Sequence, residues 1–200
     1  MASGGKAKTV AEVLRHEFAE PLHQRLAALR WKKTISPVEY AALCALVDAA
    51  IGLIERAARE GALGVLDGRD KRVVARVQRA LELLILASLH RLKVLTKKDH
   101  DLRAALGPFH TLAEAVAKLC EASRWPVPRH EIQERIHFLD RKLEQSGRDL
   151  DAVNDWIGRR LALVLTEDET HAAALAAAYD QAQAEMLLGL RCDLGLRPAD

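Results

Sequence analysis

Two nine-residue stretches of the chain hold histidines and glutamates at a spacing that could bind metal ions. They read RHEFAEPLH, which ends at His23, and RHEIQERIH, which ends at His137. Each contains a Glu-x-x-His pair, formed by Glu20 with His23 and by Glu134 with His137. Di-metal carboxylate bundles place such a pair on each of two helices and add one glutamate from each of two others. One hypothesis is therefore a di-metal oxidoreductase built inside a helical bundle.

The helical periodicity of both stretches argues against this hypothesis. At about 100° per residue, His130, Glu134 and His137 share one side of a helix, and apolar residues such as Ile132 fall on the opposite side. In the first stretch, Pro21 would clash with the preceding turn and kink the segment. We therefore expect both lines of polar residues to face solvent, with no metal and no cofactor.

The elements that would position these residues are helices. Half of the residues are apolar, only 4% are aromatic, and Ala and Leu recur throughout, a composition that favours closely packed helices. No segment alternates with period two, so no sheet is expected. Gly and Pro mark the breaks between periodic runs. We predict an all-α multi-helix bundle of about eight helices, with two long central antiparallel ones at 37–60 and 70–95, and the others at 10–32, 97–106, 112–123, 128–145, 149–165 and 167–192.

Several helix starts carry a recognisable local pattern. Ser/Thr-x-x-Glu capping boxes begin at Thr9, Ser36, Thr111 and Thr166, and each predicts the start of a helix. The pattern at Ser36 is the clearest, because Pro37 falls at the first helical position, where its missing N–H has no effect.

The stretch RWPVPR at 124–129 is the best candidate for a boundary within the chain. We predict a disordered tail at 1–9, an N-terminal helical lobe at 10–123, a C-terminal three-helix lobe at 128–193 and a tail at 194–200. The second lobe should pack on the first to give one compact domain.

The net charge of +2 conceals an uneven distribution of charge. Residues 1–68 carry 9 basic and 8 acidic side chains, residues 69–160 carry 19 and 13, and residues 161–200 carry 2 and 7. A basic middle and an acidic end can attract polyanions, a second copy of the chain, or each other.

Basic side chains recur at spacings of three and four along the helix predicted at 70–95 and continue beyond it. This basic stripe could follow nucleic-acid phosphates without reading bases. His90 continues the stripe, and Glu82 is expected to be exposed beside Arg79. Interspersed acids and scarce aromatics favour the alternative, an ordinary solvated face. The basic stripe consists of Arg69, Arg72, Arg76, Arg79, Lys93, Lys97, Lys98 and Arg103.

The last predicted helix carries residues at alternating steps of four and three, the spacing of a helix-pairing seam. Internal packing is the favoured interpretation, and docking of a partner or a second copy is the alternative. This α-helical seam consists of Leu175, Tyr179, Ala182, Met186 and Gly189.

Several classes of protein lack support in the sequence. The three cysteines form no CxxC pair and are odd in number, which argues against a disulfide framework or a cysteine zinc site and fits a reducing cytoplasm. No targeting segment, membrane span or common catalytic motif is found. We therefore expect a cytoplasmic, non-catalytic interaction or assembly subunit with no evident small-molecule substrate, which binds itself or a protein partner and has an accessory basic surface. A dedicated nonspecific nucleic-acid binder and the di-metal enzyme are the alternatives.

Overall fold

The computed structural model describes residues 10–61 and 71–196, with the side chains of 11–61 and 73–196. All regular secondary structure in these ranges is helical, and they contain no strand. The prediction of an all-α multi-helix bundle is therefore confirmed. Most of the two predicted terminal tails lies outside the described residues.

The helices begin and end close to the predicted positions, apart from the last, which starts five residues later than expected. The first three elements follow one another without a break, so they form a single rod with a π-helical segment in it. The elements are α1 (Val10–Val13), the π-helical η1 (Leu14–Ala19), α2 (Glu20–Trp31), α3 (Pro37–Arg59), α4 (Lys71–Thr96), α5 (His100–Leu106), α6 (Phe109–Ala122), α7 (Arg129–Gln145), α8 (Leu150–Thr166) and α9 (Ala172–Asp193).

Both ends of α3 are set by local interactions. The Ser36 hydroxyl accepts a hydrogen bond from the Glu39 N–H at 3.1 Å, and the Glu39 carboxylate accepts one from the Ser36 N–H at 2.6 Å. Pro37 occupies the first helical position, as expected. Gly61, just after the helix, has φ = +76°, a conformation that glycine adopts without steric cost.

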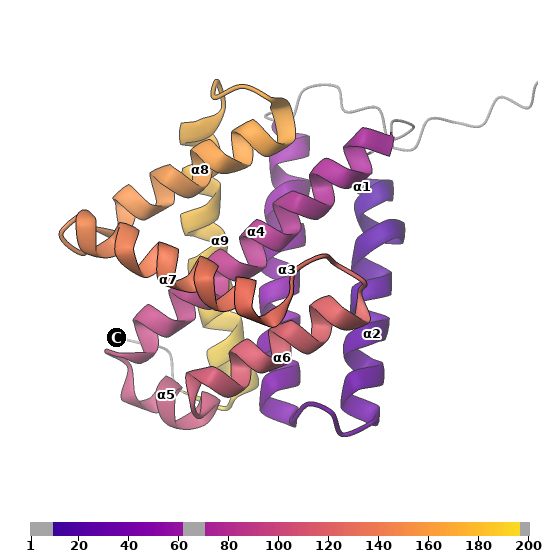
Figure 1. Ribbon diagram of the computed structural model, residues 1–200, viewed down its shortest axis with the longest axis vertical. Helices are drawn as coiled ribbons and strands as arrows, with labels where there is room; N and C mark the ends of the chain where they lie inside the picture. The colour runs from indigo at the N-terminus through magenta and orange to yellow at the C-terminus, as the bar shows by residue number, and fades with distance from the viewer. Residues whose placement is uncertain (1–9, 62–70, 197–200) are drawn as a thin grey trace, which may run out of the picture.

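The bundle is centred on α3, α4 and α9. In Figure 1, α2 and α3 run side by side, α4 crosses them obliquely, and α6 and α7 cover the near side. The two long helices α3 and α4 contact each other, and α9 packs most extensively along α8 and α3. A single hydrophobic core connects all these layers, from Leu14 in η1 to Leu190 in α9.

The α-helical seam of α9 is mostly internal. Leu175, Tyr179, Ala182 and Met186 are buried within the fold, and only Gly189 is exposed. These four side chains pack within the chain, as the favoured interpretation expects, and docking of a partner or a second copy on this helix stays a prediction.

The α3 helix is long and apolar enough to cross a membrane by length and composition. The core helix of a soluble protein meets the same criterion, so this property is weak evidence. The expectation that the chain has no membrane segment therefore stays a prediction.

Candidate interaction groove

The two Glu-x-x-His pairs lie on separate parts of the bundle. Their helices, α2 and α7, are on different sides in Figure 1. The His23 Nε2 atom is 2.8 Å from Asp48 Oδ1 of α3, whereas Glu134 and His137 are exposed on α7. Within the described residues, no group of three or more His, Cys, Asp or Glu side chains could hold a metal ion. The di-metal hypothesis therefore gains no support from the geometry.

The basic stripe is interrupted by contacts with other helices. Arg69 and the side chain of Arg72 lie outside the described part of the structure. Arg76 is half-buried and forms an ion pair with Glu167, in the turn between α8 and α9. The members of the stripe that remain exposed are Arg79, Lys97, Lys98 and Arg103.

A second interruption lies where α7 crosses α4. The Lys93 ammonium donates to Asp140 Oδ2 at 2.5 Å, and His90 Nε2 lies 3.2 Å from Asp140 Oδ1. His90 is only 2% exposed, so its predicted place on the surface was wrong. The exposed part of the stripe therefore divides into Arg79 within α4 and a second group, Lys97, Lys98 and Arg103, that follows the C-terminal end of α4.

The surroundings of His90 and Asp140 shift the pKa values of both groups. Burial lowers the pKa of His90 below its ordinary value, although the Asp140 carboxylate opposes the shift. Burial alone would raise the pKa of Asp140, but the hydrogen bond and charge of Lys93 hold it below its usual value. The ion pair between α4 and α7 therefore persists near neutral pH.

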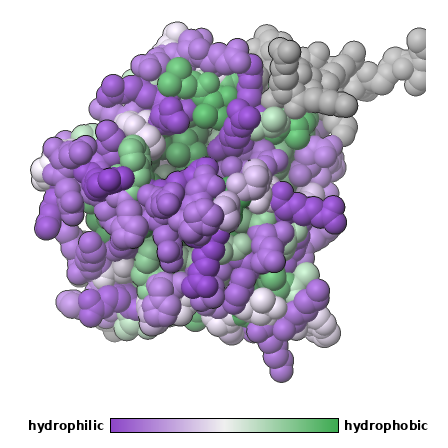
Figure 2. All heavy atoms as spheres, viewed as in Figure 1, coloured by the Kyte–Doolittle hydropathy of each residue, from purple (hydrophilic) through white to green (hydrophobic). Residues whose placement is uncertain are grey.

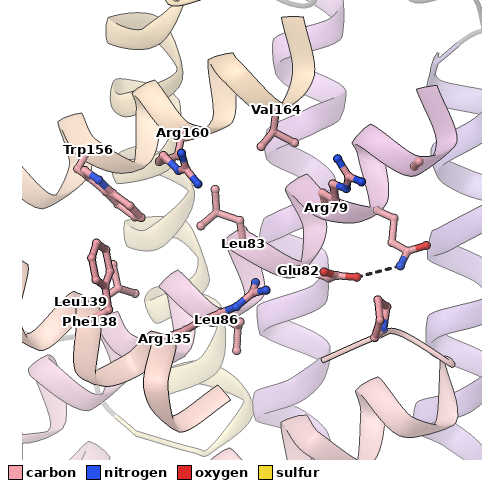
Figure 3. A pocket seen from close by; sticks show the side chains of 13 residues that line it. Arg79, Glu82, Leu83, Leu86, Arg135, Phe138, Leu139, Trp156, Arg160 and Val164 are labelled. Carbon is pink, nitrogen blue, oxygen red and sulfur yellow. Dashed lines mark hydrogen bonds between the residues drawn. The ribbon is translucent and has the colours of Figure 1, made fainter. Parts of the chain in front are cut away.

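A groove of about 690 Å³ opens between α4, α7 and α8. Figure 3 shows that three arginines, one from each helix, surround aliphatic side chains. The spacing on each helix explains this arrangement, because residues three or four apart share one face. We call this site the arginine groove and define it by Arg79, Arg135 and Arg160 at its rim and by Leu83, Leu86, Leu139 and Val164 in its floor.

An aromatic pair closes one end of the arginine groove. The ring centroids of Phe138 and Trp156 are 5.2 Å apart, with an interplanar angle of 53°. The Arg160 guanidinium lies 5.9 Å from the Trp156 ring, and the Lys142 ammonium lies 5.6 Å from the Phe138 ring. Both aromatic rings therefore already have partners within the chain.

Among the described residues that line the groove, only Glu82 is acidic, and it is buried, with 6% of its surface exposed. It accepts a hydrogen bond from Gln78 Nε2 at 2.9 Å, so the expectation of an exposed Glu82 beside Arg79 was wrong. The reason is that α7 packs against α4, and Cys120 of α6 lies close enough for the charge of Glu82 to act on its thiol.

The reactive and charged side chains at the groove differ in their surroundings. The nearby Cys120 thiol has a pKa raised to about 12, first by burial and then by the charge of Glu82, so it is not an activated nucleophile. Arg135 donates from Nε to Glu131 at 3.0 Å. For Arg79 and Arg160, the described residues supply no ion pair, which leaves two guanidinium groups to meet an incoming ligand.

Sequence reasoning did not identify this groove, because its residues come from three helices that are distant along the chain. One signal was present: Trp156, Arg160 and Val164 recur every four residues on α8, which places an aromatic, a cation and an aliphatic on one face. Compared with known proteins, the chain matches no protein-family model, no curated protein and no solved structure.

Proposed function

We propose that the protein is a non-catalytic, all-helical interaction subunit that binds an acidic amphipathic helix of a partner protein in the arginine groove. The observation that carries this proposal is an aliphatic floor beneath three arginines that come from three different helices. Hydrophobic grooves between helices are a recurring acceptor for the apolar face of an amphipathic helix.

The shape and surface of the groove support such an occupant. Phe138, which lines the groove, and Leu163, one turn after Arg160, are two of the few large apolar residues exposed in the described part of the chain. Figure 2 shows apolar surface gathered over α8 beside a hollow toward α4, with hydrophilic surface around it. An apolar patch with a polar border is typical of an interaction site.

The charge of the groove determines the type of partner. Arg79 and Arg160 are exposed, and guanidinium groups bind carboxylates through two parallel hydrogen bonds. A helix with leucines on one face and glutamates beside them would pack its leucines on the aliphatic floor and pair its carboxylates with the arginines of the rim.

Nucleic acid is a weaker fit to the same surface. Nonspecific binders combine a continuous basic track with free aromatic faces for base stacking. Here Arg76 and Lys93 are engaged by Glu167 and Asp140, and Trp156 is already in contact with Phe138 and Arg160. The nucleic-acid alternative therefore becomes an outcome of the test below.

The test uses a labelled helical peptide with leucines at positions i, i+3, i+4 and i+7 and glutamates flanking them. Fluorescence anisotropy should show binding of this peptide and much weaker binding of the same peptide with lysine in place of glutamate. Replacing Arg79 and Arg160 together by Glu should weaken binding by about a hundredfold or more, because each of the two lost charge-assisted hydrogen bonds is worth roughly a factor of ten.

The matched control is the double variant Lys98→Glu with Arg141→Glu. Both residues are exposed and neither lines the groove, so this variant should bind the acidic peptide as the unchanged protein does. Equal binding of both peptides, or equal loss in both variants, would contradict the proposal. Steeply salt-dependent binding of labelled single-stranded DNA, without binding of the peptide, would replace it with the nucleic-acid alternative.

A further inference from the structure

A second hollow, of about 510 Å³, lies at the C-terminal end of α4, between α4, α5 and α6. Figure 1 shows α5 linking the end of α4 to the start of α6. Asp99 caps α5 by accepting a hydrogen bond from the Leu102 N–H at 2.9 Å. Gly107, at φ = +72°, then turns the chain toward Pro108 and α6. These two tight connections shape the hollow, which we call the α4–α6 cup.

The inner wall of the cup is apolar. Leu92, Leu106 and Leu112 are buried, and Phe109 is half-buried beside them. The volume falls within the range of about 300–1,000 Å³ that is usual for small-molecule sites. The apolar part of a small ligand could therefore be accommodated here.

Three cationic side chains converge on the cup, and none of the described residues that line it is acidic. They are Lys93 of α4, Lys97 in the turn just after α4, and Arg103 of α5. Asp140 neutralises Lys93 from the α7 side. Lys97 and Arg103 are exposed and form no ion pair with any described residue. Two positive charges therefore remain unmatched at the edge of an apolar cavity.

The positive charges in the cup act on one another and on their surroundings. Lys93, in the last turn of α4, and Lys97, just after that helix, both line the cup, where their like charges repel each other. Burial lowers the pKa of His90, and the charges of Lys93 and Lys97 lower it further against the effect of Asp140. An anion in the cup would relieve this repulsion.

We propose that the α4–α6 cup binds a phosphate monoester carried on an apolar body. A phosphate monoester carries close to two negative charges at neutral pH, which matches Lys97 and Arg103, and its apolar body matches the leucine wall. A single carboxylate would match only one of the two cations. This site differs from the arginine groove, whose lining includes the buried Glu82.

The probe for this proposal is octyl phosphate, titrated into the full-length protein by isothermal titration calorimetry. Octyl phosphate should bind. Octanol lacks the phosphate and inorganic phosphate lacks the apolar chain, so each should bind at least tenfold more weakly. Lys97→Glu and Arg103→Glu should each weaken binding by about tenfold or more. Ala104→Phe, at an exposed position that lines the cup, should block binding by filling it.

The matched control is Lys98→Glu, because Lys98 is the exposed neighbour of Lys97 and does not line the cup. It should bind octyl phosphate as the unchanged protein does, and an equal loss in Lys98→Glu and Lys97→Glu would overturn the proposal. Equal binding of octanol and octyl phosphate would also overturn it. Flotation with phosphatidylcholine vesicles, with and without phosphatidic acid, identifies the source of the phosphate. Binding only to vesicles with phosphatidic acid indicates a lipid headgroup, binding only to octyl phosphate indicates a soluble ligand, and binding to neither rejects the site.

Discussion

The helices α9 and α7 are held in the bundle by different means. α9 lies so close to α8 that a Cβ atom on Gly158 would be 2.3 Å from the Ala172 carbonyl oxygen and 2.7 Å from the Ala176 Cβ. α7 buries one apolar stripe and is tied to α4 by the contacts of Asp140 with His90 and Lys93.

The close contact of α8 with α9 therefore matters for the stability of the fold, whereas the looser packing of α7 matters for the proposed binding of a ligand. Close backbone approach leaves no room between α8 and α9 for a ligand, and it makes that contact sensitive to single methyl groups. The attachment of α7 is looser, leaves the arginine groove open beside it, and depends on titratable groups. The opposite face of α8 carries Trp156 and Arg160 into the groove, so one helix contributes to both regions.

The largest effect is expected at the α8–α9 contact. Gly158→Ala should lower the free energy of unfolding by about 3 kcal/mol, the upper part of the range for overpacking a well-packed site. The added methyl group would meet backbone and Cβ atoms that cannot rotate away. Urea unfolding followed by circular dichroism would measure the loss.

Gly52→Ala is the matched control, because Gly52 is also within a helix and a Cβ there would have no atom within 4 Å. It should raise the free energy of unfolding by about 0.5–1 kcal/mol, because alanine favours a helix more than glycine does. Equal stabilities of the two variants would show that α8 and α9 are not in close contact.

The next effect concerns pH and the attachment of α7. Burial lowers the pKa of His90, so below about pH 6.5 the unfolded chain takes up a proton that the folded protein does not. The free energy of unfolding should therefore fall as the pH is lowered through this range, by at most about 1.4 kcal/mol per pH unit. The stabilisation from the lowered pKa of Asp140 is present above its ordinary pKa and is lost only at more acidic pH.

Urea unfolding at several pH values between about 7.5 and 5.5 would measure this slope. His90→Gln should make it shallower, whereas His130→Gln, on the exposed side of α7, should leave it unchanged. A slope that is identical in all three proteins would mean that His90 does not couple folding to pH.

The local sequence predicted the bounds of the helices better than it predicted which side chains are buried and what they contact. Ser36 and Pro37 act at the start of α3 and Gly61 acts just after its end. Each lies within a few residues of the bound that it sets, so the bounds of α3 could be predicted. The same capping pattern failed at Thr111 and Thr166. The Thr111 hydroxyl donates to the Pro108 carbonyl within the first turn of α6, and the Thr166 hydroxyl donates to the Ala162 carbonyl at the end of α8. The pattern alone does not distinguish the start of a helix from its first or last turn.

Residues that define the two candidate sites were only partly predictable. Helical periodicity put Glu82, His90 and Lys93 on the polar side of α4. That side is covered by other helices, and the partner Asp140 lies about fifty residues further along the chain. Burial that depends on such distant contacts is not encoded in local periodicity.

The smallest expected effect tests the outer face of α9. Gly189 is the one residue of the α-helical seam that is exposed, and a Cβ there would have no atom within 4 Å. If this face is solvated, Gly189→Ala should raise the free energy of unfolding by about 0.5–1 kcal/mol, because alanine favours the helix more than glycine does. Binding of the acidic peptide should not change.

The measurement is urea unfolding at two protein concentrations, together with light scattering. A gain in stability that does not depend on protein concentration would mean that α9 packs only on the side that faces α8 and α3. This result would agree with the description of α9 as a helix held by close packing within the chain. A loss of stability, with a shift to lower molecular mass in Gly189→Ala, would instead mean that a second copy packs closely on this glycine. In that case α9, and not the groove beside α7, would provide the self-association that an assembly subunit requires.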